Sequence, residues 1–121
     1  MKLVYAAVLC ATAFMLSAMA PSPLPDELMK KKTEHAQAIL KQLALADLKA
    51  VKAEAEALER LTREGGFDHK TDRYSEYGRE FLRITRELIS EAGKNNMAGS
   101  YYQFTRMTSV CFSCHEHIRG K

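Results

Sequence analysis

Apolar residues recur at steps of three and four along most of the chain, with charged residues at the positions between them. This spacing gives an α-helix one apolar face, and the abundance of Ala, Leu, Glu and Lys favours helices as well. The pattern predicts four helices, over residues 26–44, 48–63, 73–92 and 97–118. Four amphipathic helices joined by short links predict an all-α fold, an up-down-up-down four-helix bundle.

The breaks between these helices carry residues that favour turns. Asp47 is a good N-cap for the second helix, and a tight turn is expected at 45–47. Glycines and Asx residues mark the loop at 63–72 and the break at 93–100. The alternative is one long helix over 26–63, because no glycine or proline interrupts that segment.

The same periodicity predicts which side chains face the core. The first two helices are expected to bury Met29, Ala36, Ile39, Leu40, Leu43, Leu48, Val51, Ala55 and Leu58. The third is expected to bury Tyr74, Tyr77, Phe81, Ile84, Leu88 and Ala92. The fourth is expected to bury Tyr101, Phe104, Thr108, Cys111, His115 and Ile118. An apolar face left over on the first two helices would suit a homodimer.

The N-terminus has the layout of a secretory signal peptide. Lys2 precedes an uncharged apolar run over 3–16, and small residues close the segment at Ala20. Residues 1–20 are therefore expected to direct export to the periplasm. Because Pro21 disfavours cleavage directly before it, an uncleaved N-terminal membrane anchor is the alternative to a cleaved signal peptide.

The remaining chain divides into a proline-rich leader at 21–25 and one helical domain at 26–121. The formal charge of the whole chain is +3, and removal of 1–20 leaves +2 because that segment holds one Lys and no acidic residue. This balance lacks the basic stripe of a nucleic-acid-binding protein, so no nucleic-acid partner is expected. Removal also takes Cys10 and leaves two cysteines in the mature chain.

Those two cysteines stand in "CFSCH", at Cys111 and Cys114, directly before His115. Cys-x-x-Cys-His is the spacing of c-type haem attachment. The two thiols add across the two vinyl groups of a haem, and the histidine reaches the iron from the same side. On a helix, residues four apart point the same way, which places Cys111 and His115 on one face.

Two other chemistries use similar residues. A thiol–disulfide redox pair expects a thioredoxin-like βαβ context, whereas this motif closes a helical chain. A zinc site from Cys111, Cys114, His115 or His117 would need a second ligand pair elsewhere, and His35 and His69 are the other histidines. Haem attachment is therefore favoured over both.

The ending "CFSCHEHIR" carries a resemblance to a known family, because Cys111, Cys114, His115 and Arg119 match a C-x-x-C-H-x-x-x-R pattern on the last predicted helix. The segment "LMKKKTEHAQAILKQLALAD" at 28–47 is similar to the family's first helix. On these residues the chain resembles the class II c-type cytochromes, the cytochrome c prime-like family, as a small exported bacterial member. The resemblance implies one covalently attached haem c, with His115 as the proximal iron ligand.

The resemblance also implies what lies on the distal face of the haem. The family's first helix crosses that face, and Met29 falls where low-spin members present a methionine ligand. The alternative is a methionine that packs in the core, and His35 is a rival ligand. Arg119 is a candidate contact for a haem propionate, with a charge that complements the helix C-terminus as the alternative.

These observations favour a carrier of single electrons that works with a redox partner protein and converts no substrate. No enzymatic activity is expected, and the alternative left open is a minor peroxidase-type activity of an open haem. The first alternative is a five-coordinate haem protein that binds nitric oxide or carbon monoxide. The second is a helical scaffold without haem, with a Cys/His metal site or a disulfide.

Overall fold

The computed structural model describes residues 25–65 and 71–120. In these ranges the chain is helical and contains no strand. The four helices are α1 (Pro25–Ala44), α2 (Leu48–Gly65), α3 (Asp72–Gly93) and α4 (Met97–Ile118). The predicted signal peptide, most of the predicted leader and His69 lie outside the described residues. The all-α prediction is confirmed, with helix bounds within two residues of those expected.

A tight turn separates α1 from α2, so the alternative of one long helix is wrong. Ala46 has a φ of 58°, in the left-handed region, which reverses the chain immediately after α1. The carboxylate Oδ1 of Asp47 accepts a hydrogen bond from the Ala50 N–H at 2.9 Å. Asp47 therefore caps α2 by satisfying one of the N–H groups that the first turn of a helix leaves without a partner.

Replacing Asp47 with alanine is expected to lower the free energy of unfolding by about 1 kcal/mol, because the Ala50 N–H loses its side-chain acceptor. Asp47→Asn is the matched control, since asparagine keeps a side-chain oxygen at the cap. Urea denaturation followed by circular dichroism gives both values. Equal loss in the two variants would show that the charge, and not the cap, stabilises this turn.

The last two helices begin with side-chain caps of the same kind. Thr71 precedes α3, and its hydroxyl accepts a hydrogen bond from the Tyr74 N–H at 3.1 Å. Asn96 precedes α4, and its Oδ1 accepts from the Gly99 N–H at 3.0 Å. These caps fix where α3 and α4 start.

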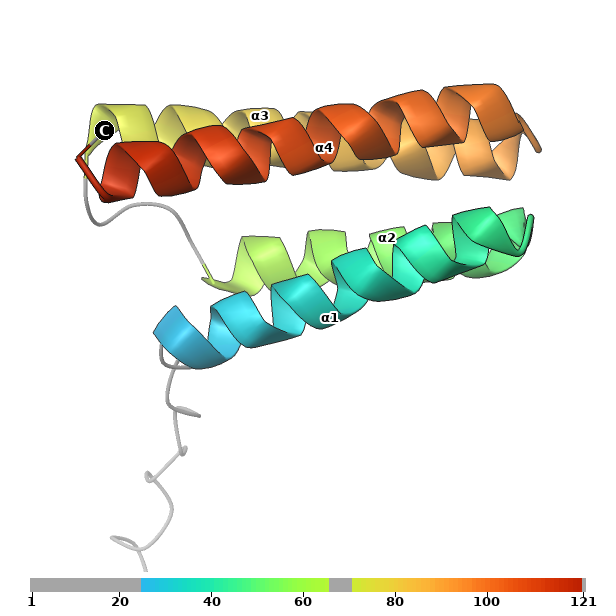
Figure 1. The fold of residues 1–121 in the computed structure, drawn as a ribbon, viewed down its shortest axis with the longest axis horizontal. Helices are drawn as coiled ribbons and strands as arrows, with labels where there is room; N and C mark the ends of the chain where they lie inside the picture. Colours follow the sequence, from blue (N-terminus) through green and yellow to red (C-terminus); the bar gives the residue numbers. More distant parts are fainter. Residues whose placement is uncertain (1–24, 66–70, 121) are drawn as a thin grey trace, which may run out of the picture.

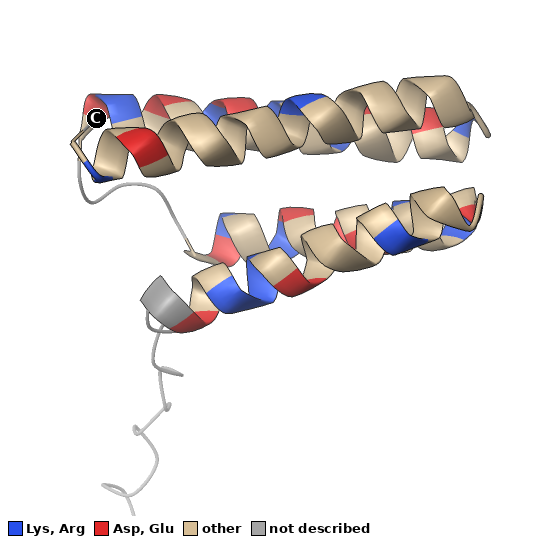
Figure 2. Cartoon of the chain, viewed as in Figure 1, with Lys and Arg blue, Asp and Glu red and all other residues tan. Residues whose placement is uncertain are grey.

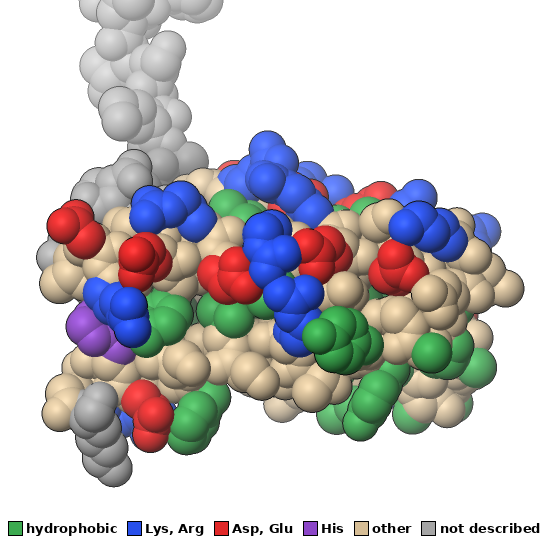
Figure 3. All heavy atoms as spheres, turned by 90° about the horizontal axis from the view of Figure 1, so that it is seen from above, with side chains coloured by type: hydrophobic (Ala, Val, Ile, Leu, Met, Phe, Trp, Pro, Cys, Tyr) green, Lys and Arg blue, Asp and Glu red, His purple; other side chains and the backbone are tan. Residues whose placement is uncertain are grey.

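The helices run alternately up and down and pack side by side (Figure 1). Consecutive helices are in extensive contact, whereas α1 and α4 touch at far fewer positions. Charged residues are spread along α1, α2 and α3, whereas α4 holds only Arg106 and Glu116 (Figure 2). Seen from above, basic and acidic side chains lie interleaved (Figure 3).

Because α1 and α4 touch at so few positions, the bundle is most loosely closed along the α1–α4 side.

One core runs between the helices, and all of its members except Met107 were expected there. Its members are Ile39, Leu43, Leu48, Val51, Ala55, Leu58, Phe81, Ile84, Leu88, Ala92, Phe104 and Met107. Ion pairs tie neighbouring helices together at its margin: Arg86 Nε lies 2.7 Å from Glu59 Oε1 on α2, and Arg106 on α4 donates to Glu87 Oε2 at 2.9 Å.

Four residues expected in the core are exposed instead, namely Leu40, Tyr101, Thr108 and Ile118. Leu40 is 54 % exposed, Tyr101 61 % and Ile118 49 %. On α1 the buried face contains Ile39 and Leu43. Leu40 follows Ile39 directly in sequence and therefore points away from that face. On α4 the buried residues are Ser100, Phe104 and Met107, so the helix is rotated away from the predicted stripe.

None of the described helices is long and apolar enough to cross a bilayer.

Candidate functional site

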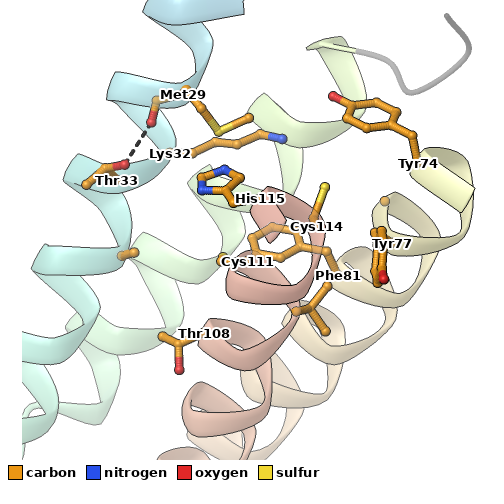
Figure 4. Close-up of a pocket in the computed structure, with 13 residues that line it drawn as sticks. Met29, Lys32, Thr33, Tyr74, Tyr77, Phe81, Thr108, Cys111, Cys114 and His115 are labelled. Carbon is orange, nitrogen blue, oxygen red and sulfur yellow. Dashed lines mark hydrogen bonds between the residues drawn. The ribbon is translucent and has the colours of Figure 1, made fainter. Parts of the chain in front are cut away.

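A cavity of about 240 Å³ lies among α1, α3 and α4, towards the C-terminal end of α4. Each of the three helices contributes a wall, and the side chains that form it point into a common space (Figure 4). Thr33 on α1 and Thr108 on α4 line the cavity and are both exposed. The cavity therefore opens to the surface on the loosely closed α1–α4 side.

The wall from α4 contains the motif that the sequence singled out. Cys111, Cys114 and His115 all line the cavity, and all three are partly buried. Both cysteines are thiols and form no disulfide. Burial raises the pKa of the Cys111 thiol, and the nearby Lys32 ammonium opposes that shift. The motif thus presents two sulfurs and an imidazole to one space.

The wall from α1 is formed by Met29, Lys32, Thr33 and Ala36. Their spacing of three, four and seven residues keeps them on one helical face. The Thr33 hydroxyl donates a hydrogen bond to the Met29 carbonyl oxygen at 2.9 Å, within the helix. Met29 and Lys32 both extend from α1 into the cavity (Figure 4). Helix α1 therefore brings a thioether and an amine to the side facing α4.

Aromatic residues dominate the wall from α3. Tyr74, Tyr77 and Phe81 lie on successive turns of one face, with Gly78 between them. Glycine inside a helix costs about 1 kcal/mol relative to alanine, so its presence calls for a local reason. Here Gly78 is buried and lines the cavity, so this position adds no side chain to the wall. The wall from α3 is therefore mainly aromatic.

Among the candidate haem residues from the sequence, four line this cavity: Met29, Cys111, Cys114 and His115. Arg119 does not. It follows the last turn of α4, where its Nε donates to the His115 carbonyl oxygen at 3.1 Å. In this position Arg119 stabilises the end of the helix, and its contact with a propionate stays a prediction.

The remaining described histidines, His35 and His117, do not line the cavity. His35 faces α2, where its Nδ1 is 2.7 Å from Glu54 Oε2. His117 packs beside Tyr77, with ring centroids 6.0 Å apart, and lies 3.4 Å from the Thr71 hydroxyl. Both have structural partners, which leaves His115 as the imidazole that faces the cavity.

Lys32 and Gly78 are among the residues of the site that were not expected from the sequence. Lys32 stands in the run "MKKK", which is typical of a solvated helix face, although it lies three residues after Met29 and shares its stripe. The sequence does contain an indication for Gly78, because it is an isolated glycine within a strongly helical segment. The place of both residues in the site becomes clear once α1 and α3 are known to line the same cavity.

The residues present fit a c-type haem in their chemistry. Two thiols and an imidazole stand on one helix with the spacing of covalent attachment. The opposite walls are mainly apolar and aromatic, which suits a porphyrin face, although α1 also contributes Lys32 and Thr33. Cofactor pockets commonly measure about 300–1,000 Å³, so a porphyrin would extend through the mouth or move α1 outward. The sparse contact between α1 and α4 allows either.

Comparison with protein-family models, with curated proteins and with solved structures finds no match for this chain. Within residues 25–65 and 71–120, no three His, Cys, Asp or Glu side chains come together as a group able to hold a bare metal ion.

Proposed function

We propose that this protein is a c-type haem protein that carries single electrons in the periplasm. Cys111 and Cys114 hold the haem through thioether bonds, and His115 is its proximal iron ligand. The observation that carries the proposal is the convergence of these three side chains on one apolar cavity. A chance Cys-x-x-Cys-His on the solvent face of α4 would have no such cavity in front of it. The resemblance to the cytochrome c prime-like family supports the same conclusion.

The chain's own residues have separable roles in this proposal. When bound, the haem iron supplies the one-electron change between its ferric and ferrous states. His115 would hold the iron from α4, and Met29, on the facing wall from α1, is the candidate distal ligand. Tyr74, Tyr77 and Phe81 exclude water and lower the local dielectric, which favours the less charged ferrous state. No step of electron transfer requires a residue that exchanges protons with a substrate.

The second candidate function is reversible binding of nitric oxide or carbon monoxide. The open mouth between Thr33 and Thr108 favours it, because a diatomic gas could reach the distal side from solvent. The two functions differ in whether a protein side chain occupies the sixth position of the iron.

The absorption spectrum of the ferrous protein, produced in cells that attach haem c, separates these functions. Electron transfer predicts covalent haem and sharp low-spin bands that carbon monoxide leaves unchanged. A high-spin spectrum that shifts with the gas would favour gas binding. Absence of haem after denaturation and extraction would overturn both and leave the helical scaffold with a metal site or a disulfide.

A further inference from the structure

We propose that the outward face of α4 is the contact surface of a symmetric homodimer, in which the α4 helices of two copies pack antiparallel about Thr105. This surface is separate from the proposed attachment of haem, and the inference does not depend on it. The second copy is placed on α4, whereas the sequence indicated the first two helices as the dimer face.

The outward face of α4 is apolar and carries no charge over most of the helix. Figure 2 shows far fewer charged residues on α4 than on the other three helices. Arg106 is turned towards α3, where its guanidinium lies 3.6 Å from Glu80 and 2.9 Å from Glu87. The exposed residues that remain form what we call the outward stripe: Ala98, Tyr101, Tyr102, Thr105, Ser109 and Phe112. Its three aromatic members are 60–61 % exposed.

The outward stripe repeats every seven residues, as the contact surface of a coiled coil does. Ala98, Thr105 and Phe112 are seven positions apart, and the other members fall between them. A repeat of seven keeps the same side chains at the seam between two helices that cross at a shallow angle. Single exposed apolar residues are common and need no explanation, but three aromatic residues aligned on one uncharged stripe indicate a contact surface.

The outward stripe is complementary to itself when one copy is turned end for end. With Thr105 at the centre, Tyr101 lies opposite Ser109 of the second copy, and Phe112 lies opposite Ala98 of the second copy. Each bulky side chain then meets a small one, so the two helices can approach and pack without voids. Parallel helices would instead place each aromatic residue against its own counterpart. The size pattern therefore favours a two-fold antiparallel contact, which is closed and uses the same patch on both copies.

The polar members of the outward stripe already have partners within α4. The Thr105 hydroxyl donates to the Tyr101 carbonyl oxygen at 3.0 Å, and the Ser109 hydroxyl donates to the Thr105 carbonyl oxygen at 3.0 Å. Covering these hydroxyls therefore leaves no donor unpaired. The tyrosine hydroxyls stand at the tips of their side chains and can stay hydrated at the rim. Association thus removes apolar surface from water at little polar cost.

The size of the outward stripe limits the strength of the contact. From Ala98 to Phe112 it is about 21 Å long, and a helix is about 10 Å wide. Such a face is smaller than the roughly 800 Å² per partner of a standard interface. We therefore expect a dimer that forms at high concentration and dissociates on dilution.

The test follows the mass of the full holoprotein by analytical ultracentrifugation from micromolar to millimolar concentration. The wild type is expected to change from monomer to dimer over this range. Thr105→Glu is expected to stay monomeric, because the contact would bring two carboxylates together at its centre. Glutamate suits an exposed helical position, so the fold is kept. Leu40→Glu, which adds the same charge at an exposed site on α1, is expected to dimerise as the wild type does.

Thr105→Lys provides the second variant and is also expected to be monomeric alone. An equal mixture of Thr105→Glu and Thr105→Lys is expected to form dimers again, because opposite charges then meet at the centre of the contact. A monomeric wild type, a dimer that survives Thr105→Glu, a dimer lost in Leu40→Glu, or a mixture that stays monomeric would overturn the inference. Haem content, measured in the same samples, tests the proposed function separately.

Discussion

A double variant, Cys111→Ala/Cys114→Ala, is expected to emerge from haem-maturing cells without covalently bound haem. Both thioether bonds start from these sulfurs, which line the same cavity as His115. Each single variant can form at most one of the two bonds. A haem stain after denaturing electrophoresis, together with the pyridine haemochrome spectrum, measures the loss and counts the remaining thioethers.

The matched control is Ser109→Ala/Ser113→Ala, which also places two alanines on α4 around the same motif. Neither serine lines the cavity. This control is expected to bind as much haem as the wild type, because alanine is a strong helix former and no sulfur is lost. Haem retained in the cysteine variant, or lost equally in the serine control, would show that attachment does not depend on these thiols.

The fold followed from the sequence because local and long-range signals agree along most of the chain. The apolar stripe of α3 through Phe81, Ile84 and Leu88 is flanked by charged residues, so only one face could be buried. Asp47 marked the start of α2 although no glycine precedes it, since the Asx side chain supplies the cap. Such elements are specified by residues close to one another in sequence.

Helix α4 was harder to orient because apolar residues occur on most of its circumference. Tyr101, Tyr102 and Phe112 are exposed, while Phe104 and Met107 are buried, and periodicity alone does not separate the two sets. Packing against α3 decides which face of α4 is buried. The sequence of α4 alone does not contain that information. The placement of Leu40 failed for the same reason, since Ile39 is adjacent and faces the core more directly.

The candidate site was predictable on one helix and not across helices. Cys111 and His115 share a face of α4 through their spacing of four residues, which the sequence specifies directly. Lys32 joins them through the packing of α1 over the cavity, a tertiary relation between residues about 80 positions apart along the chain. A lysine in a basic run is usually solvated, so its partial burial is visible only in the folded structure.

Replacing Leu88 with alanine is expected to reduce the free energy of unfolding by about 2–5 kcal/mol. Leu88 is 0 % exposed and lies in the core cluster that all four helices share. The change removes buried methyl groups and leaves a cavity that rigid helices close only in part. Domains of this kind are commonly stable by about 5–15 kcal/mol, so the loss is a large fraction of the total. Urea denaturation of the protein without haem measures it.

Leu40→Ala makes the same chemical change at a site that is 54 % exposed, and it is expected to shift stability by about 0.5 kcal/mol or less. Both leucines lie within helices, so the difference in helix propensity is common to the two variants and cancels in the comparison. The remaining gap measures burial alone. A similar loss at both sites would mean that Leu40 is covered in solution, for instance by a second copy of the chain at the face expected to form a homodimer. In that case the loss at Leu40 should shrink as the protein is diluted, whereas the loss at Leu88 should not.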